Sequence, residues 1–314
     1  MGQNTQIRGF VEANIHLEDN KLNFGFGEQD LFITSQLNDH FSFLGESVFK
    51  FSPSSPTEFS VSVERVIVTY NYAGNHNILI GKHHTPINYW NDTYHHGRVF
   101  FPTVQRPLLF SAKIIPIHTT GIALQGLNLG NLRFGYNVML GNGLGSEEIT
   151  DNDKSKSLTV AVHIKPWNNW QIGTSFYNDA ISAGAKAFGK TFQEKVNQQL
   201  YTASVAHFGK QYELLAEATV SSDRSNSTGR ATAFAGYIYA GVRLNDQWVP
   251  YFRYDNLTFE SNEPIFGMDD KTSFVLGVRY EISYLVVVKL EYQHLDSDAS
   301  GKFDSLTTQI AIGF

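Results

Sequence analysis

Cysteine is absent from this chain of 314 residues. Its absence removes disulfide bonds, paired-cysteine redox motifs and thiolate metal sites together. Long apolar runs are missing as well, because no stretch approaches the roughly 20 residues that a transmembrane helix needs. The richest short run is 285–288. A bundle of membrane helices is therefore excluded.

Charged side chains are scarce, and neither sign dominates any region. They make up 17% of the residues, whereas about a quarter is usual in soluble domains. The formal net charge is -6, without a long run of one sign. We expect no nucleic-acid partner, because that binding relies on clustered lysine and arginine. Residues 1–6 lack the basic and apolar regions of a signal peptide, so the sequence represents either a cytoplasmic protein or a processed form.

Apolar and polar residues alternate with a period of two along the whole chain, in segments of about ten residues. In the last segment Leu306, Ile310 and Ile312 share one face, while Thr307 and Gln309 lie on the other. Similar alternation covers 7–17, 212–220, 274–282 and 286–292. The pattern predicts β-strands with one apolar and one polar face.

Short turns rich in Asn, Asp and Gly alternate with longer connections, and these residues suit turns because they tolerate positive φ or bond their own backbone. The long connections are predicted at 19–29, 52–57, 83–117, 141–156, 180–197, 222–229, 260–270 and 297–304. About seven turns and eight loops would separate about sixteen strands, leaving enough residues for strands that span a bilayer. Both chain ends would then lie on the side of the short turns.

Aromatic residues stand beside the short turns and the C-terminus. They are Phe41, Tyr72, Trp167, Trp170, Phe208, Tyr212, Trp248, Tyr284 and Phe314. If the strands are antiparallel neighbours, these side chains lie near one plane, as in the aromatic girdle at a membrane interface. The alternative is that aromatic residues are simply favoured in strands.

The soluble all-β alternatives are a sandwich, a propeller and a solenoid. A sandwich is usually shorter, and the other two need a self-similar repeat, which this sequence lacks. Closing the sheet leaves no exposed edge and is obligatory for strands in lipid. With no linker and no shift of composition along the chain, we predict one domain over 1–314. It is an all-β, transmembrane antiparallel β-barrel of about 16 strands in the cell outer membrane.

The terminal segment 305–314, which ends on Phe314, resembles the C-terminal assembly signal of Gram-negative outer-membrane proteins. Segments 41–46 (FSFLGE), 80–90 (IGKHHTPINYW) and 250–255 (PYFRYD) resemble porins of the Bacteroidota, a group similar to the phosphate-selective porins. This resemblance implies passive diffusion through the barrel, often as a homotrimer, and insertion by the barrel-assembly machinery. It also implies a third external loop folded into the lumen as a constriction, here 83–117.

Basic and titratable groups gather in and beside that loop. The predicted constriction residues are Lys82, His83, His84, His95, His96, Arg98 and Arg106. The predicted lining of the wall is Arg8, Glu12, Glu46, Glu64, Arg133, Arg243, Arg253, Asp255, Arg279, Lys289 and Glu291. A basic constriction favours anions, whereas a wall of mixed sign favours general diffusion of small hydrophilic solutes or ions. General diffusion is the first prediction and an anion-preferring, phosphate-type channel is the alternative.

Other kinds of site have weaker support. The two His-His pairs raise the question of a metal, but adjacent side chains on an extended chain point apart, so we predict no metal and no cofactor. No motif marks an enzyme, and a structural or docking barrel within a larger outer-membrane complex stays as a rival. Acidic residues in the connection at 141–156 would bridge through divalent cations to outer-membrane lipid and lipopolysaccharide, or would simply be solvated.

Overall fold

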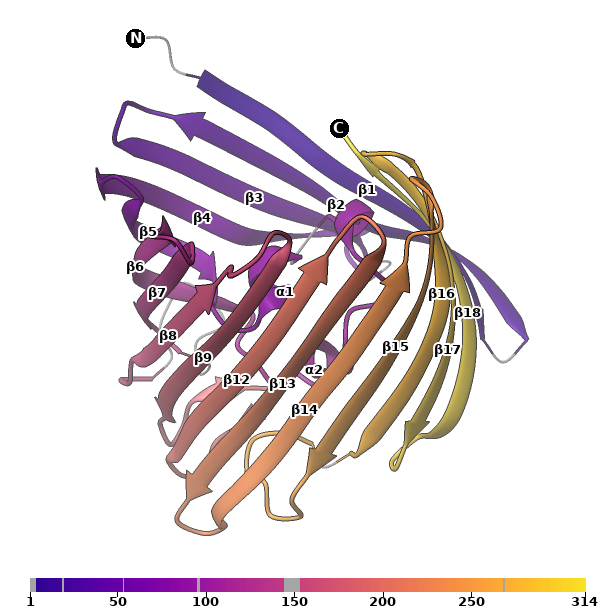
Figure 1. The fold of residues 1–314 in the computed structure, drawn as a ribbon. Helices are drawn as coiled ribbons and strands as arrows, with labels where there is room; N and C mark the ends of the chain where they lie inside the picture. The colour runs from indigo at the N-terminus through magenta and orange to yellow at the C-terminus, as the bar shows by residue number, and fades with distance from the viewer. Residues whose placement is uncertain (1–3, 19, 53, 95–96, 144–152, 268) are drawn as a thin grey trace.

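The computed structural model describes residues 4–18, 20–52, 54–94, 97–143, 153–267 and 269–314. Within them, sixteen antiparallel strands form a closed barrel in which each strand pairs with its neighbours along the chain and β1 pairs with β18 (Figure 1). At the closure, the backbone N–H of Gly9 donates to the carbonyl of Phe314 and the N–H of Phe314 donates to that of Gly9. The predicted fold class is confirmed.

The barrel strands are long, and the remaining elements are short. The strands are β1 (Asn4–Glu18), β2 (Lys21–Gln36), β3 (Phe41–Phe51), β4 (Phe59–Ala73), β5 (His76–His84), β6 (His118–Leu129), β7 (Phe134–Gly141), β8 (Ser157–Ile164), β9 (Trp170–Ile181), β12 (Val196–Phe208), β13 (Tyr212–Ser225), β14 (Gly229–Val242), β15 (Trp248–Phe259), β16 (Lys271–Ser283), β17 (Val286–Ser297) and β18 (Gly301–Gly313). A separate hairpin consists of β10 (Lys186–Ala187) and β11 (Lys190–Thr191). The connection between β5 and β6 holds α1 (Tyr89–Thr93), η1 (Arg98–Phe100) and α2 (Leu108–Ser111).

Alternation along the strands separates an inner from an outer surface. In β15 the inward Arg253 and Asp255 are buried, while the outward Phe252 and Tyr254 are only partly covered. Large apolar side chains such as Ile122 and Leu276 are exposed on the outside, which gives the barrel the apolar outer band of a membrane protein. Among the described residues, no helix is long and apolar enough to cross a bilayer.

Three of the connections predicted to be long are tight turns instead. At 19–29, β1 continues to Glu18 and β2 already begins at Lys21. The predicted loops at 222–229 and 297–304 shrink in the same way, with β14 beginning at Gly229 and β18 at Gly301, both glycines at positive φ. In the first segment Leu22, Phe24 and Phe26 continue the outward apolar row between polar and glycine residues. The other two segments are mostly polar and still pair as strands. Composition alone therefore suggested loops.

Most aromatic residues predicted in the girdle are exposed on the outer surface near the short turns, among them Trp167, Trp248 and Phe314. Tyr284 instead contacts the ring of Phe100 at the mouth of the lumen, with ring centroids 5.4 Å apart. Phe208 is the second exception. Its ring turns into the lumen and stacks with Tyr89 and Tyr239, at centroid distances of 6.5 and 6.4 Å. It ends β12 on the inward face, so this part of the girdle prediction was wrong.

Candidate functional site: a loop folded across the lumen

The connection between β5 and β6, residues 85–117, folds into the barrel and is called the lumenal loop here. Figure 1 shows its helices α1 and α2 inside the ring of strands. Prolines at 86, 102 and 107 deny it a regular strand. Gly97 adopts a φ of 79°, and a Cβ there would meet the ring of Phe10 at 3.1 Å. The backbone of the loop is therefore irregular, and at Gly97 it passes too close to Phe10 for a larger side chain.

One face of the lumenal loop packs an apolar core against the inner wall formed by β9 and β12 to β16. Trp90 is completely buried and lies edge-on to Phe101 and Tyr237, with ring centroids 5.4 and 6.0 Å apart. Phe110 and Ile114 extend the same cluster. Apolar packing inside the barrel therefore anchors this face of the loop to that wall.

Carboxylates of the wall accept hydrogen bonds from backbone N–H groups of the lumenal loop. Glu217 accepts from Tyr89 and, at 3.2 Å, from Trp90. Asp255 accepts from Leu108 at 3.1 Å. Glu291 accepts from residues 104 and 105 at 2.8 and 3.4 Å. These donors lie in short helical turns and bends without strand partners, so the wall satisfies groups that would be costly to bury unpaired.

Basic side chains of the same wall donate to carbonyl groups of the lumenal loop. Arg253 Nη1 donates to the carbonyl of Gln105 at 2.6 Å, and Arg279 Nη1 donates to that of Pro102 at 3.2 Å. Lys289 Nζ donates to the carbonyl of Arg98 at 2.6 Å. Five predicted lining residues, Arg253, Asp255, Arg279, Lys289 and Glu291, lie on the inward face and are at most 5% exposed beneath the loop. They position the loop rather than line open water.

The opposite wall, on β1 to β4, presents carboxylates to the other side of the lumenal loop. Glu12 lies 3.6 Å from the Nε of Arg98, measured at its Oε2. Glu64 Oε2 lies 2.9 Å from His118 Nε2, and Glu46 Oε2 lies 3.9 Å from His84 Nε2. Of the predicted residues, the structure thus brings Glu12, Glu46, Glu64, His84 and Arg98 to one region.

Two further charged residues of this wall, Arg65 and Asp30, were not among the predicted site residues. Arg65 pairs with Glu46, although its neighbour Glu64 also faces the lumen. A register shift between Glu46 and Ser47 in the β3–β4 ladder breaks the alternation and lets both point inward. Asp30, which accepts the N–H of Gly97 at 3.4 Å, lies in a segment whose start was assigned to a loop. No local signal in the sequence marks the bulge.

The other predicted constriction residues that the structure describes, Lys82, His83 and Arg106, differ in their surroundings. Lys82 sits opposite the outward Val66, and its Nζ donates to the carbonyl of Val63 at 2.7 Å. His83 is buried within β5. Arg106 packs over the ring of Phe101, 5.7 Å from its centroid, and burial lowers its pKa to about 10, so it stays charged at neutral pH. His95 and His96 lie outside the described residues.

The remaining lining predictions concern residues near the short turns. Arg8 is exposed and donates to Gln6 at 3.0 Å. Arg133 fixes the next turn, since its Nη2 donates to the carbonyls of Lys165 and Trp167 at 3.0 and 2.8 Å. Within the described part of the chain, no group of three or more His, Cys, Asp or Glu residues is arranged to hold a metal ion.

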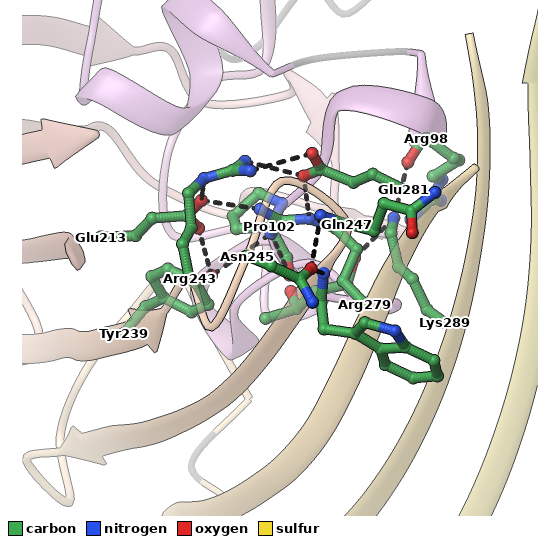
Figure 2. Close-up of polar contacts among 12 residues, drawn as sticks. Arg98, Pro102, Glu213, Tyr239, Arg243, Asn245, Gln247, Arg279, Glu281 and Lys289 are labelled. Atoms are coloured by element: carbon green, nitrogen blue, oxygen red, sulfur yellow. Dashed lines mark hydrogen bonds and ion pairs between the residues drawn. The ribbon is translucent and has the colours of Figure 1, made fainter. Parts of the chain in front are cut away.

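Arg243, the last predicted lining residue, belongs to a charged network on the short-turn side of the lumenal loop. Figure 2 shows Arg243 and Arg279 next to Glu213 and Glu281. Arg243 Nη2 donates to Glu281 at 2.8 Å, and Arg279 Nη2 donates to Glu213 at 2.7 Å. The network borders a cavity of about 720 Å³ that Lys210 also lines. The two signs are balanced around this cavity.

A smaller cavity, of about 260 Å³, lies near β1 to β3 and is lined by Glu12, Glu28, Lys50, Arg98 and Gln105. Lys50 Nζ pairs with Glu28 at 2.8 Å. Polar spaces bordered by both signs of charge therefore occur in two parts of the lumen. Such spaces hold water and small polar solutes, and they offer no apolar pocket of the kind that binds larger ligands.

A second connection, between β15 and β16, folds inward at the long-loop end of the barrel. In the connection between β15 and β16, Glu263 is buried, accepts the N–H groups of Ile265 and Phe266, and touches Asp223 of β13. Lys190 Nζ donates to the carbonyl of Pro264 at 2.7 Å. Burial raises the pKa of Glu263 above its usual range.

This raised pKa predicts that the connection at 260–270 loosens in alkali. A folded pKa above the unfolded value means that stabilisation is complete below the unfolded pKa and is lost as the pH rises through the folded one. Because the chain has no cysteine, a spin label on Ser261→Cys would report on this connection alone. We expect its mobility to increase with pH, and Glu263→Gln to remove most of the increase. Mobility that is independent of pH would refute the prediction.

Comparison with known proteins yields structural relatives only. No family model matches this chain, and no curated protein matches it. In vitro folded OmpT, an outer membrane protein of Vibrio cholerae in its trimer form, matches with a TM-score of 0.72 at 13% identity over 100% of both chains. The anion-selective porin from Comamonas acidovorans matches with a TM-score of 0.72 at 10% identity, also over 100% of both chains.

OmpF of Salmonella typhi, solved in complex with daunomycin, matches with a TM-score of 0.71 at 10% identity, over 99% of this chain and 97% of that one. At such identities the likeness concerns the fold. The chain has the barrel architecture of outer-membrane proteins, and its structural neighbours include porins.

Proposed function

We propose that the protein is an outer-membrane porin through which small hydrophilic solutes or ions diffuse passively. The observation that carries this proposal is the lumenal loop, which charged wall residues and an apolar core fix inside a barrel that keeps cavities bordered by charged residues. A fixed loop narrows a pore without closing it. We further propose that the barrel has no enzymatic activity and needs no cofactor.

General diffusion with weak selectivity is the form we favour, because acidic and basic groups face each other in both cavities. An anion-preferring channel of the phosphate type is the alternative, supported by Arg98 and by the number of histidines in the sequence between 83 and 118. A docking barrel in a larger outer-membrane complex is supported by a different observation, the apolar core that occupies part of the lumen.

Planar-bilayer recording of the detergent-purified protein separates these functions. A porin should show stepwise, ohmic openings, and reversal potential in a KCl gradient should show weak selectivity. Marked anion selectivity would favour the phosphate-type alternative. A correctly folded but silent barrel would refute diffusion and favour the docking barrel, whose partner co-purification should then reveal.

Histidine protonation should tune the selectivity. His84 and His118 flank the lumenal loop at the ends of β5 and β6, and they lie next to the carboxylates of Glu46 and Glu64 on the nearby strands β3 and β4. Protonation of these rings adds positive charge, so we expect anion preference to strengthen as the pH is lowered. The double variant His84→Gln, His118→Gln should flatten this dependence, while His294→Gln, on the outer surface, should leave it intact. Selectivity that stays constant as the pH is lowered would contradict the exposure of these groups to the pore.

The assembly we propose is a homotrimer inserted by the barrel-assembly machinery, with Phe314 as its signal and with outer-membrane lipid and lipopolysaccharide around it. The exposed ring of Phe314 on the outer surface suits recognition by another protein. The trimer form of the Vibrio cholerae protein supports the stoichiometry by analogy of fold. Light scattering in detergent tests it, and a monomeric mass would refute it.

A further inference from the structure

Two arginines face each other across the hairpin of β13 and β14. Arg224 and Arg230 are paired directly in the register of this ladder, and both side chains are exposed. The neighbours Asp223 and Ser225 are buried on the inner face, so alternation places the two arginines on the outer surface. The hairpin forms part of the end of the barrel opposite the two termini in Figure 1.

Neither guanidinium has a hydrogen-bond or ion-pair partner in the part of the chain that the structure describes. Like charges directly opposite each other on neighbouring strands are destabilising. A charge elsewhere on the same rim is neutralised, since Lys302 Nζ lies 3.1 Å from Asp296. Two carboxylates bind the backbone of the same hairpin, Glu194 at Asn226 and Glu260 at Thr232. Neither is paired with a guanidinium among the described residues, so the two arginines keep their donors free for an anion.

The pair stands just beyond the apolar outer surface. Along β13, the next outward residue after Arg224 is Ser222, followed by Val220, which is exposed. Along β14, Thr232 and then the exposed Phe234 follow Arg230 in the same way. One outward step along a strand covers about 6 to 7 Å. The guanidinium groups thus lie one polar row above the apolar band, at the level where lipid headgroups begin.

We propose that Arg224 and Arg230 together bind the phosphate of a lipid headgroup in the leaflet that surrounds the long-loop end of the barrel. Guanidinium groups hold phosphate through paired, charge-assisted hydrogen bonds. Two guanidinium groups on adjacent strands can bind the same phosphate, whose negative charge offsets their mutual repulsion. The position above an apolar surface selects an anion attached to acyl chains over an anion free in solution. This inference rests on the proposed membrane location of the barrel.

Native mass spectrometry of the protein from phosphatidylcholine nanodiscs, with and without phosphatidic acid, tests the site. We expect the wild type to retain phosphatidic acid. The affinity of the double variant Arg224→Gln, Arg230→Gln for this lipid should be at least about tenfold lower, because charge-assisted hydrogen bonds are lost. Lys302→Gln, which removes a neutralised charge from the same rim, is the matched control and should bind like the wild type. Equal retention by the double variant would overturn the proposal, and so would displacement by millimolar inorganic phosphate.

A charge reversal separates binding from folding. Arg230→Glu places an opposite charge next to Arg224, so we expect a higher Tm in lipid-free detergent together with weaker phosphatidic acid binding. A variant that binds lipid normally would contradict the proposal. Conductance in planar bilayers should stay unchanged in all these variants, because the pair lies outside the lumen. A silent channel that still retains phosphatidic acid would refute the porin function and leave this site intact.

Discussion

Replacing Trp90 with alanine should free the lumenal loop from the barrel wall and raise single-channel conductance, with added noise between current levels. Trp90 is completely buried between Phe101 and Tyr237. Truncating a buried tryptophan typically costs about 3–5 kcal/mol. Here that cost falls on the docking of the loop, because the strand ladders of the barrel stay intact.

The measurement is planar-bilayer recording of Trp90→Ala beside Trp167→Ala. Trp167 lies on the outer surface and is 62% exposed, so its truncation removes a similar volume without touching the loop. We expect the control to conduct like the wild type. If both variants kept wild-type conductance, the apolar core would not restrain the loop, and the proposed constriction would lose its main support.

Replacing Arg253 with methionine should have an effect of similar size for an electrostatic reason. The guanidinium is fully buried, lies 2.8 Å from Asp255 Oδ2, and donates to Thr103 and to the carbonyl of Gln105. Its removal leaves the carboxylate of Asp255 buried without its ion-pair partner, which typically costs about 3–5 kcal/mol. We expect a lower Tm and a mobile loop.

A second variant identifies the cause of that loss. In Arg253→Met, Asp255→Leu both charges are gone, and replacing a buried ion pair by apolar residues of similar volume is often close to neutral. We therefore expect Tm to recover by more than half. The loop should stay partly mobile, because the N–H of Leu108 has lost its acceptor. A double variant that unfolds as readily as Arg253→Met would show that the carboxylate is not responsible.

The barrel architecture could be predicted from the sequence because the alternation that marks a strand involves only residues close together in the chain. Alternation at Leu306, Ile310 and Ile312 depends only on neighbouring residues, and the closed barrel follows once strands must bury an apolar outer face in lipid without leaving an edge. Turn lengths were predicted less well. At 19–29 the paired strand continues with Leu22, Phe24 and Phe26 exposed on its outer face, and the polar and glycine residues between them suggested a loop.

Which residues face the lumen was also largely readable from alternation. In the structure, Arg253, Asp255, Arg279, Lys289 and Glu291 all point inward. The hydrogen-bond partners of these side chains could not be predicted from the sequence. Each contact joins positions about 150 to 190 residues apart, as between Arg253 and Gln105 or Lys289 and Arg98. Whether a charged side chain meets water or a backbone carbonyl depends on where the loop lies.

The sequence by itself therefore determined the strand period, the apolar outer surface and the longest connection, which enters the lumen. Only the tertiary structure decided that this loop packs on β9 and β12 to β16, that charges of β13 and β15 to β17 hold it, and that Glu12, Glu46 and Glu64 lie on the opposite wall. The physical reason is the range of the interactions. Alternation is set by adjacent residues, whereas the burial and pairing of charges are set by segments that meet only when the barrel closes.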